Sequence, residues 1–267
     1  MTSESIFAYT QANKAAWNAS AHLHGQGASW DRLLLAAAQP GFNVLDDCLI
    51  STLRELAIAG RSAVQIGCNN ARELLSLAAL GAQPLLGIDQ SSAFLAQGAV
   101  LADRAGLHPL LLEANIYQLP SDLGQHDLAL ITIGVTNWMP DLDGFFKAVR
   151  GLMRSGGHLV IYETHPILEM FNPDASNPFQ PEISYFEKSP IRIENSITYD
   201  GSDGGAGETG YWFVHTLGEI VSACVQNGFQ LQSLQEHPHM NREEDYAVYE
   251  NRSAQLPLCY TLVAQAA

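Results

Sequence analysis

The sequence predicts an α/β fold with a seven-stranded, mostly parallel sheet, one antiparallel strand, and helices on both faces. From residue 63 onward, short apolar runs alternate with amphipathic stretches, which is typical of a parallel sheet covered by helices. Two further strands follow each other without a helix, so they must pair antiparallel if they are adjacent. With 267 residues, 47% of them hydrophobic, the chain can bury the core of such a fold.

The parallel strands are predicted at residues 63–66, 84–88, 109–113, 127–133 and 158–163. Helices are predicted at 70–80, 91–105 and 142–153, the last of them stopped by Gly156 and Gly157. A helix over 215–227, closed by Gly228, leads to the two final strands at 230–237 and 258–265.

Two segments lie outside this alternation, within what we interpret as a single domain over residues 1–267. About 60 residues ahead of the sheet are predicted to be helical and to cap a cleft. Residues 164–212 are rich in Pro, Asn and Gly and too long for an ordinary connection, which indicates a lid or binding insertion. Alternation over 183–200 predicts a hairpin that packs over the cleft.

Composition excludes several classes of protein. The formal net charge of -15, without a Lys/Arg run, argues against nucleic acid as a partner. The four cysteines form no CxxC pair, which favours free thiols over a disulfide framework or a zinc site. We find no basic, apolar leader and no apolar run long enough to span a membrane, so we expect a cytoplasmic protein without a membrane partner.

The stretch VQIGCNNARELL, residues 64–75, has the strand-turn-helix pattern of a nucleotide-binding domain but only one glycine, Gly67. A pyrophosphate needs the close backbone approach that GxGxxG provides, whereas Asn69 and Asn70 tolerate left-handed angles and can bond a small charged group. The loop therefore suits an amino-acid tail. Asp89, 22 residues beyond Gly67, is spaced to accept hydrogen bonds from a ribose, or alternatively to cap the next helix.

The ends of the third and fourth strands carry two further loops. EANIYQLP places Asn115, Ile116 and Tyr117 where an adenine could be held, and TIGVTNWMPDLDGF places Gly134 and Trp138 at the cleft floor. Either loop could instead pack on itself. Trp17 is an aromatic candidate on the N-terminal arm, with core packing as the alternative.

The ordered series VQIGCNN, GIDQS, EANIYQLP and DLALITIGVTNWMPDLDGFFKAVRGLMRSGGHLVIYETHP resembles class I S-adenosylmethionine-dependent methyltransferases. It is most similar to a small-molecule-type group with a CNNG-like loop, a W-L-P-D-L segment and E-x-H-P after strand five. The similarity spans roughly residues 7–265 and implies a Rossmann-like fold. It also implies S-adenosyl-L-methionine as cofactor and S-adenosyl-L-homocysteine as product.

Residue by residue, the resemblance implies that the Gly67 loop lines the methionine moiety and Asp89 holds the ribose. Residues 115–117 would contact the adenine. Together with the two tryptophans, the predicted cofactor-binding residues are Gln65, Gly67, Cys68, Asn69, Asn70, Asp89, Gln90, Ser91, Asn115, Ile116, Tyr117, Ile133, Gly134, Trp138 and Trp17. Gln65, Ala71 and Asn115 replace the acid, glycine and aspartate of the usual family pattern.

Methyl transfer is an in-line displacement that depends mainly on positioning, so a base is needed only for acceptors that carry a proton. The predicted catalytic residues are His165, His215 and Tyr211, with His22 and His24 as further candidates on the arm. A histidine bonded to backbone is the alternative for His165. His237 and His239 lack a third ligand, so no metal is predicted.

Three functions fit the sequence. We favour a methyltransferase that acts on a small-molecule acceptor. Neither nucleic acid nor membrane is expected as a partner, and a homodimer is compatible with the sequence. The second is a non-catalytic binder of S-adenosylmethionine or S-adenosylhomocysteine, motivated by Gln65, Ala71 and Asn115. The third, a nicotinamide oxidoreductase, is motivated by the spacing of Gly67 and Asp89 and opposed by the missing glycines.

Overall fold

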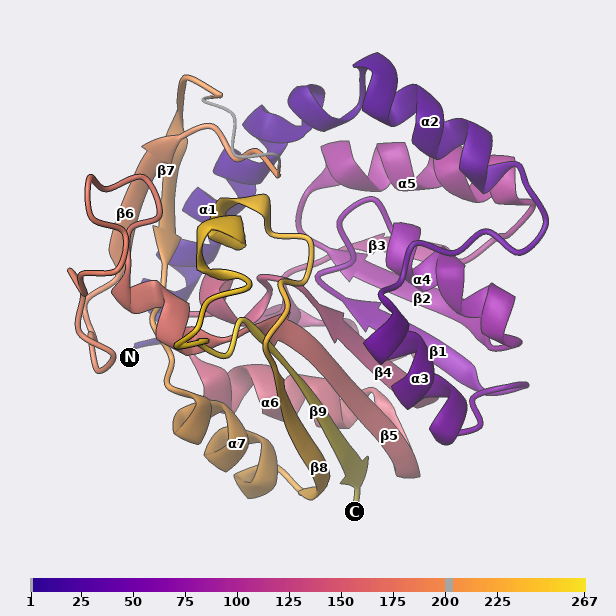
Figure 1. The fold of residues 1–267 in the computed structure, drawn as a ribbon. Helices are drawn as coiled ribbons and strands as arrows, with labels where there is room; N and C mark the ends of the chain where they lie inside the picture. Colours follow the sequence, from indigo (N-terminus) through magenta and orange to yellow (C-terminus); the bar gives the residue numbers. More distant parts are fainter. Residues whose placement is uncertain (1, 200–203) are drawn as a thin grey trace.

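A computed structural model describes residues 2–199 and 204–267 and contains a seven-stranded sheet in the order β3-β2-β1-β4-β5-β9-β8 (Figure 1). The strands are β1 (Ser62–Ile66), β2 (Gln83–Asp89), β3 (Leu110–Glu113), β4 (His126–Thr132), β5 (Met153–Thr164), β8 (Phe229–His237) and β9 (Cys259–Ala266). β9 is antiparallel to its neighbours β5 and β8, whereas the other neighbouring pairs of this sheet are parallel. The predicted fold class is confirmed.

Helices bury both faces of the central strands, because alternate side chains of a strand point to opposite faces. On β4, Ala129 and Ile131 share one buried cluster with α6 (Leu142–Gly151) and α7 (Leu217–Gln226). Leu128 and Leu130 share the opposite cluster with α3 (Asp47–Glu55) and α4 (Arg72–Ser76), the latter extended by η1 (Leu77–Leu80). This double burial explains why the strands are continuous apolar runs.

The helix predicted over 142–153 ends earlier in the structure. α6 stops at Gly151, where the backbone N–H of Leu152 turns back to the Val149 carbonyl. Met153 already pairs with His126 in the sheet, so Gly156 and Gly157 lie inside β5. The prediction that these two glycines end the helix is wrong, because β5 begins before them.

The strand order reverses at β1, which lies between β2 and β4. Ile66 of β1 is in register with Ile88 of β2 and Ile131 of β4, so these three carboxyl ends meet at one edge. α5 (Ser92–Ala105), η2 (Ile116–Gln118) and η3 (Thr136–Trp138) follow β2, β3 and β4 there. Ligands of open α/β sheets bind at such a crevice.

The N-terminal helices α1 (Ser3–His24) and α2 (Gly27–Ala37) lie on the side of this edge, with α1 beside β7 (Ala206–Trp212) (Figure 1). Asn13 of α1 binds both backbone groups of Tyr211: its Nδ2 donates to the carbonyl at 3.0 Å, and its Oδ1 accepts from the N–H at 2.6 Å.

The insertion after β5 includes η4 (Pro166–Met170) and a two-stranded sheet of β6 (Ile191–Asn195) and β7. The hairpin predicted within 183–200 is therefore wrong in extent, because β6 pairs with β7, which lies beyond that stretch. The predicted insertion also contains residues 200–203, which lie outside the described residues. η5 (Glu244–Tyr249) lies in the connection between β8 and β9.

None of the helices within the described ranges is long and apolar enough to cross a membrane. The four cysteines, at positions 48, 68, 224 and 259, are free thiols.

Candidate active site

A cavity of about 1080 Å³, including its mouth, lies at the carboxyl ends of β1, β2 and β4. Eleven predicted residues line it: Gln65, Gly67, Asn69, Asp89, Gln90, Ser91, Ile116, Ile133, Gly134, Trp138 and Trp17. The ends of separate strands thus supply the lining, as their parallel arrangement predicts.

The loop after β1 alternates left-handed residues: Gly67 has φ +64°, Asn69 +51° and Ala71 +60°. Glycine is required at position 67 for two reasons. Its φ is left-handed, and an added Cβ would lie 2.6 Å from the Val135 side chain. Asn69 tolerates its conformation and accepts the Asn70 N–H on its own side-chain oxygen at 2.8 Å. The loop keeps the bend of a glycine-rich turn with only one glycine.

Asp89 fixes this loop from the end of β2. Its two carboxylate oxygens accept the backbone N–H groups of Asn69 at 2.7 Å and Ser91 at 2.8 Å. Burial raises the pKa of Asp89, while these hydrogen bonds act in the opposite direction. Ser91, whose hydroxyl accepts the Phe94 N–H at 3.3 Å, caps α5. The residue that caps α5 is therefore Ser91, whereas Asp89 lines the cavity and holds the loop after β1.

Two buried oxygens of the cavity lining have no partner among the described residues: Oε1 of Gln65 and Oε1 of Gln90. The amide of Gln65 is oriented by a 3.0 Å hydrogen bond from its Nε2 to Thr132. An unpaired buried acceptor is costly without a donor, and a ligand with ammonium and hydroxyl groups supplies donors. These two oxygens therefore fit a ligand that carries hydrogen-bond donors.

The floor of the cavity is a strained turn at Ile133 and Gly134, with φ of +38° and +84°. Glu163, at the end of β5, accepts three consecutive backbone N–H groups of this turn: Gly134, Val135 at 2.9 Å and Thr136 at 3.2 Å. Burial raises the pKa of Glu163 to about 8, against the effect of these three donors. Glu163 thus holds the turn in place.

The titration of Glu163 has a measurable consequence for stability. Its folded pKa of about 8 lies above its ordinary 4.5, so the folded state binds more protons between these values and stability is lost as pH rises. We expect the stability advantage of the wild type over Glu163→Gln to shrink from pH 5 to pH 8, by up to about 1.4 kcal/mol per pH unit. Urea denaturation of both proteins at each pH measures this, and a constant difference would contradict it.

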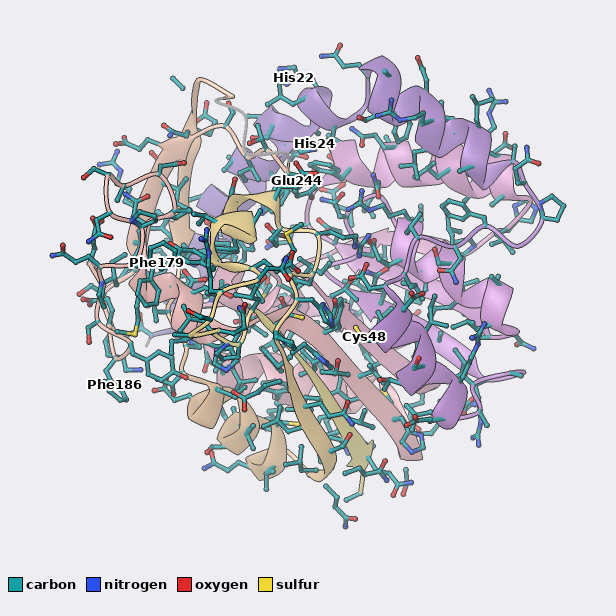
Figure 2. All side chains as sticks on the ribbon, viewed as in Figure 1. His22, His24, Cys48, Phe179, Phe186 and Glu244 are labelled. Atoms are coloured by element: carbon teal, nitrogen blue, oxygen red, sulfur yellow. The ribbon has the colours of Figure 1, made fainter. Side chains whose placement is uncertain are left out.

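Aromatic side chains close the cavity from the N-terminal arm and the insertion. The Trp17 ring centroid lies 5.3 Å from that of Trp138 and 6.1 Å from that of Tyr199. Asn69 Nδ2 donates to the Tyr199 hydroxyl at 2.8 Å. The ring of His24, which Figure 2 labels at the end of α1, lies 4.3 Å from the Tyr199 ring. The insertion therefore reaches the loop after β1.

Four predicted cofactor residues do not line the cavity. Cys68 is fully buried under the sheet, and Asn70 is 3% exposed. The Asn115 amide donates to Thr10 at 2.8 Å, and the Tyr117 hydroxyl donates to the Asp141 carbonyl at 2.9 Å. The side chains of Cys68 and Asn70 are thus buried, and those of Asn115 and Tyr117 are engaged in intramolecular hydrogen bonds.

The three predicted catalytic residues also lie outside the cavity lining. His165 has no free nitrogen, because Nδ1 accepts the Ile167 N–H at 3.1 Å and Nε2 lies 2.9 Å from Glu236. The His215 ring bonds the Met139 carbonyl at 2.8 Å and lies beside α6 and α7. The Tyr211 ring packs edge-on against Tyr9 at 4.8 Å. We therefore do not retain these residues as candidates for proton transfer.

The two arm histidines bond backbone carbonyls: His22 that of Ala19 within its own helix, and His24 that of Ile197, both at 2.8 Å.

The histidine pair considered for a metal is engaged elsewhere. His237 bonds Thr261 at 2.9 Å and stacks on His239. Within the described residues, no group of three His, Cys, Asp or Glu side chains is placed to hold a metal.

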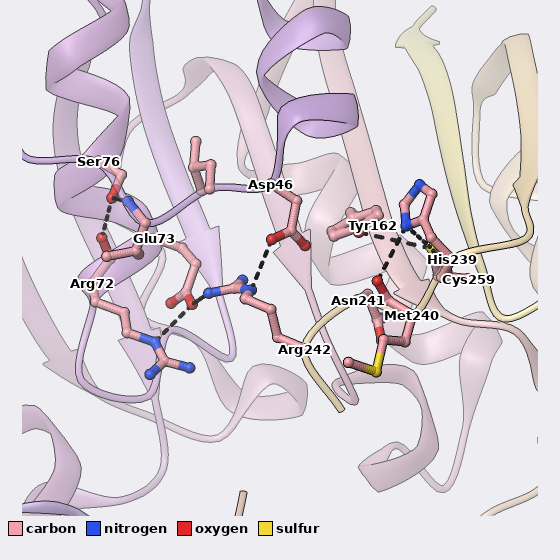
Figure 3. A network of polar contacts seen from close by, with 12 residues as sticks. Asp46, Arg72, Glu73, Ser76, Tyr162, His239, Met240, Asn241, Arg242 and Cys259 are labelled. Atoms are coloured by element: carbon pink, nitrogen blue, oxygen red, sulfur yellow. Dashed lines mark hydrogen bonds and ion pairs between the residues drawn. The ribbon is translucent and has the colours of Figure 1, made fainter. Parts of the chain in front are cut away.

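Sequence reasoning missed a charged group at the cavity wall: Arg72, Glu73, Arg242 and Glu243. Glu73 accepts Arg72 Nε at 2.9 Å and lies 3.4 Å from Nη1 of Arg242, whose Nε lies 3.1 Å from Asp46 (Figure 3). Glu73 is nearly buried, and the two arginines help to lower its pKa against the effect of burial. This network ties the connection between β8 and β9 to α3 and α4.

Residues 64–161 match the family model described as "Methyltransferase domain". No curated protein matches the chain. Among solved structures, a candidate S-adenosylmethionine-dependent methyltransferase from Listeria monocytogenes is 16% identical with a TM-score of 0.58, covering 81% of this chain and 97% of its own.

Two further solved structures share the fold. The glycopeptide N-methyltransferase MtfA, complexed with S-adenosyl-L-methionine, is 12% identical with a TM-score of 0.52 over 82% of this chain and 92% of its own. The [4+2]-cyclase SpnF is 14% identical with a TM-score of 0.55 over 82% and 80%. The resemblance predicted from the motifs is confirmed over residues 64–161, which match a methyltransferase domain, and the solved structures share the fold.

Proposed function

We propose that this protein transfers a methyl group from S-adenosylmethionine to a small-molecule acceptor. The observation that carries the proposal is the cavity at the strand-order reversal, which both Asp89 and Gly67 line. Asp89 would accept the ribose hydroxyls, and the bend with Gln65 would hold the amino-acid tail. Ile116 and Ile133 supply apolar walls for the adenine.

S-adenosylmethionine supplies an electrophilic methyl group on a sulfonium. The protein's part is to hold an acceptor in line with this methyl and to exclude water. Trp17, Trp138 and Tyr199 surround the space that remains, and their rings suit both an apolar acceptor and a neighbouring positive charge. A small acceptor is supported because α1 and the insertion both contribute to the wall of the cavity.

The net charge of -15 supports an acceptor other than nucleic acid, and the four free thiols support our assignment to the cytoplasm. A homodimer is compatible with this proposal and is tested by light scattering.

Calorimetry and turnover test the proposed function together. We expect S-adenosylhomocysteine to bind with one site per chain, and labelled S-adenosylmethionine to transfer its methyl group to members of a panel of small amines, alcohols and thiols. Tight binding without turnover on any acceptor would favour a non-catalytic binder. Binding of NADH without binding of S-adenosylhomocysteine would favour an oxidoreductase.

The insertion should control how long the cofactor stays bound. Tyr199→Phe removes the hydroxyl that Asn69 binds at 2.8 Å, and we expect S-adenosylhomocysteine to dissociate about 2- to 10-fold faster, in line with one lost hydrogen bond. Stopped-flow tryptophan fluorescence measures the rate.

Tyr185→Phe is the matched control for Tyr199→Phe. Its hydroxyl accepts a similar hydrogen bond, from the Leu217 N–H at 3.0 Å, but Tyr185 does not line the cavity. Equal dissociation rates in the two variants would show that the Tyr199 contact does not restrain the cofactor.

A further inference from the structure

We propose that Glu243 selects a protonated amine as the methyl acceptor and takes its proton. The inference rests on the proposed function and names the chemical class of its acceptor. It depends on three features of the structure: how Glu243 is positioned, why its charge lacks a partner, and what surrounds it.

Arg242 positions Glu243 at the cavity. Arg242 adopts a left-handed backbone conformation, φ +74°, which a non-glycine residue rarely takes without support. That support is the pair of carboxylates at Asp46 and Glu73, 3.1 and 3.4 Å from its guanidinium nitrogens (Figure 3). The next residue, Glu243, then faces the cavity at the start of η5. The strain and the two ion pairs define where this carboxylate lies.

Among the acidic residues of the lining, Glu243 differs in that its carboxylate has no counter-ion or hydrogen-bond donor within the described residues. Glu73 is matched by Arg72 and Arg242, and Asp89 by two backbone N–H groups. Within the described part of the chain, the Glu243 carboxylate has neither an ion pair nor a hydrogen bond. A partly buried carboxylate without a counter-ion favours a cationic ligand, which provides one.

Acidic and phenolic groups from several elements surround Glu243. Its charge helps to raise the pKa of Glu163 on β5, Glu169 on η4 and Tyr199 on the insertion. Tyr246 on η5 is affected in the same way. Glu243 shares the cavity lining with Trp17, Trp138 and Tyr199, the rings to which we assign the acceptor.

Glu243 is also suited to proton transfer near neutral pH. Burial, and next the charge of Asp245, raise its pKa to about 7, while Arg242 and Arg72 act in the opposite direction. A base is most effective when its pKa lies near the working pH. An ammonium acceptor would give its proton to the Glu243 carboxylate, and the freed nitrogen lone pair would form the bond to the methyl carbon. The carbon–sulfur bond breaks with its electron pair going to sulfur, which leaves the methylated amine as its ammonium ion and S-adenosylhomocysteine with an uncharged thioether sulfur.

The test compares matched probes on protein loaded with S-adenosylhomocysteine. Benzylamine and tryptamine are cations at pH 8, and benzyl alcohol and tryptophol are their neutral counterparts. We expect the wild type to bind at least one amine tenfold or more tightly than its alcohol by calorimetry. This preference should disappear in Glu243→Gln and, in the wild type, should decline as pH falls below about 7. Glu244→Gln, at the exposed neighbouring residue, is the control that should retain it (Figure 2).

The outcomes separate the two proposals. Absence of an amine preference in the wild type, or its survival in Glu243→Gln, would overturn the role of Glu243 while cofactor binding stands. Glu243→Gln must bind S-adenosylhomocysteine as the wild type does, because a loss would place Glu243 in the cofactor subsite instead. If the wild type fails to bind S-adenosylhomocysteine, the proposed function falls and this inference with it.

Discussion

Asp89→Ala is expected to weaken S-adenosylhomocysteine binding about 10- to 150-fold. The carboxylate faces the cavity and would accept the ribose hydroxyls, and hydrogen bonds to a charged group contribute about 1.5 to 3 kcal/mol. It also accepts the Asn69 and Ser91 N–H groups, so its removal releases the bend that would hold the amino-acid tail. Isothermal titration calorimetry measures the change.

Two further variants separate binding from folding in this prediction. Asp89→Asn keeps one acceptor oxygen for the loop, so it should retain more stability than Asp89→Ala while still losing affinity. Asp127→Ala is the matched control, since the Asp127 carboxylate also accepts a backbone N–H, that of Ser62 at 2.9 Å, but does not line the cavity. Unchanged affinity in folded Asp89→Ala would remove Asp89 from the cofactor site.

Glu163→Ala is expected to lower the free energy of unfolding by about 3 to 5 kcal/mol. Alanine would leave three N–H groups of the turn at residues 134–136 without their acceptor, and each buried unsatisfied donor costs about 1 to 3 kcal/mol before the turn relaxes. The turn follows Ile133, which has a left-handed conformation with φ +38°, so the lost hydrogen bonds would also remove support next to strained backbone. Urea denaturation at pH 7 measures the loss.

Glu236→Ala is the control for Glu163→Ala. Glu236 pairs with His165, yet its side chain is 53% exposed, so its removal should cost less than about 1 kcal/mol. A similarly small effect for Glu163→Ala would show that the turn is held by its own packing.

The sequence predicts the cavity residues that immediately follow a strand. Gly67, Asp89 and Gly134 could be placed because apolar runs locate the strands and parallel strands end at a common edge. The same logic included Asn115 and Tyr117, which follow β3, but their amide and hydroxyl are engaged by Thr10 and Asp141. Position along the chain does not reveal where a side chain finds its partner.

Arg242 and Glu243 could not be found in this way. They lie in an irregular connection without periodicity, and the contact of Arg242 with Glu73 joins residues 169 positions apart. The one indication in the sequence is a short charged run, Arg242-Glu243-Glu244, which follows His237 and His239. The prediction of His165 as a catalytic base likewise could not take account of its hydrogen bonds. The turn that begins at Pro166 directs the Ile167 N–H onto the His165 ring.

A crystal structure of the complex with S-adenosylhomocysteine tests the central claim most directly. The account predicts the ribose hydroxyls within hydrogen-bond distance of the Asp89 carboxylate, the amino-acid tail against the bend at Gly67 to Asn70, and open space between the sulfur and Glu243. A nucleoside bound elsewhere, or one whose ribose lies away from Asp89, would contradict it.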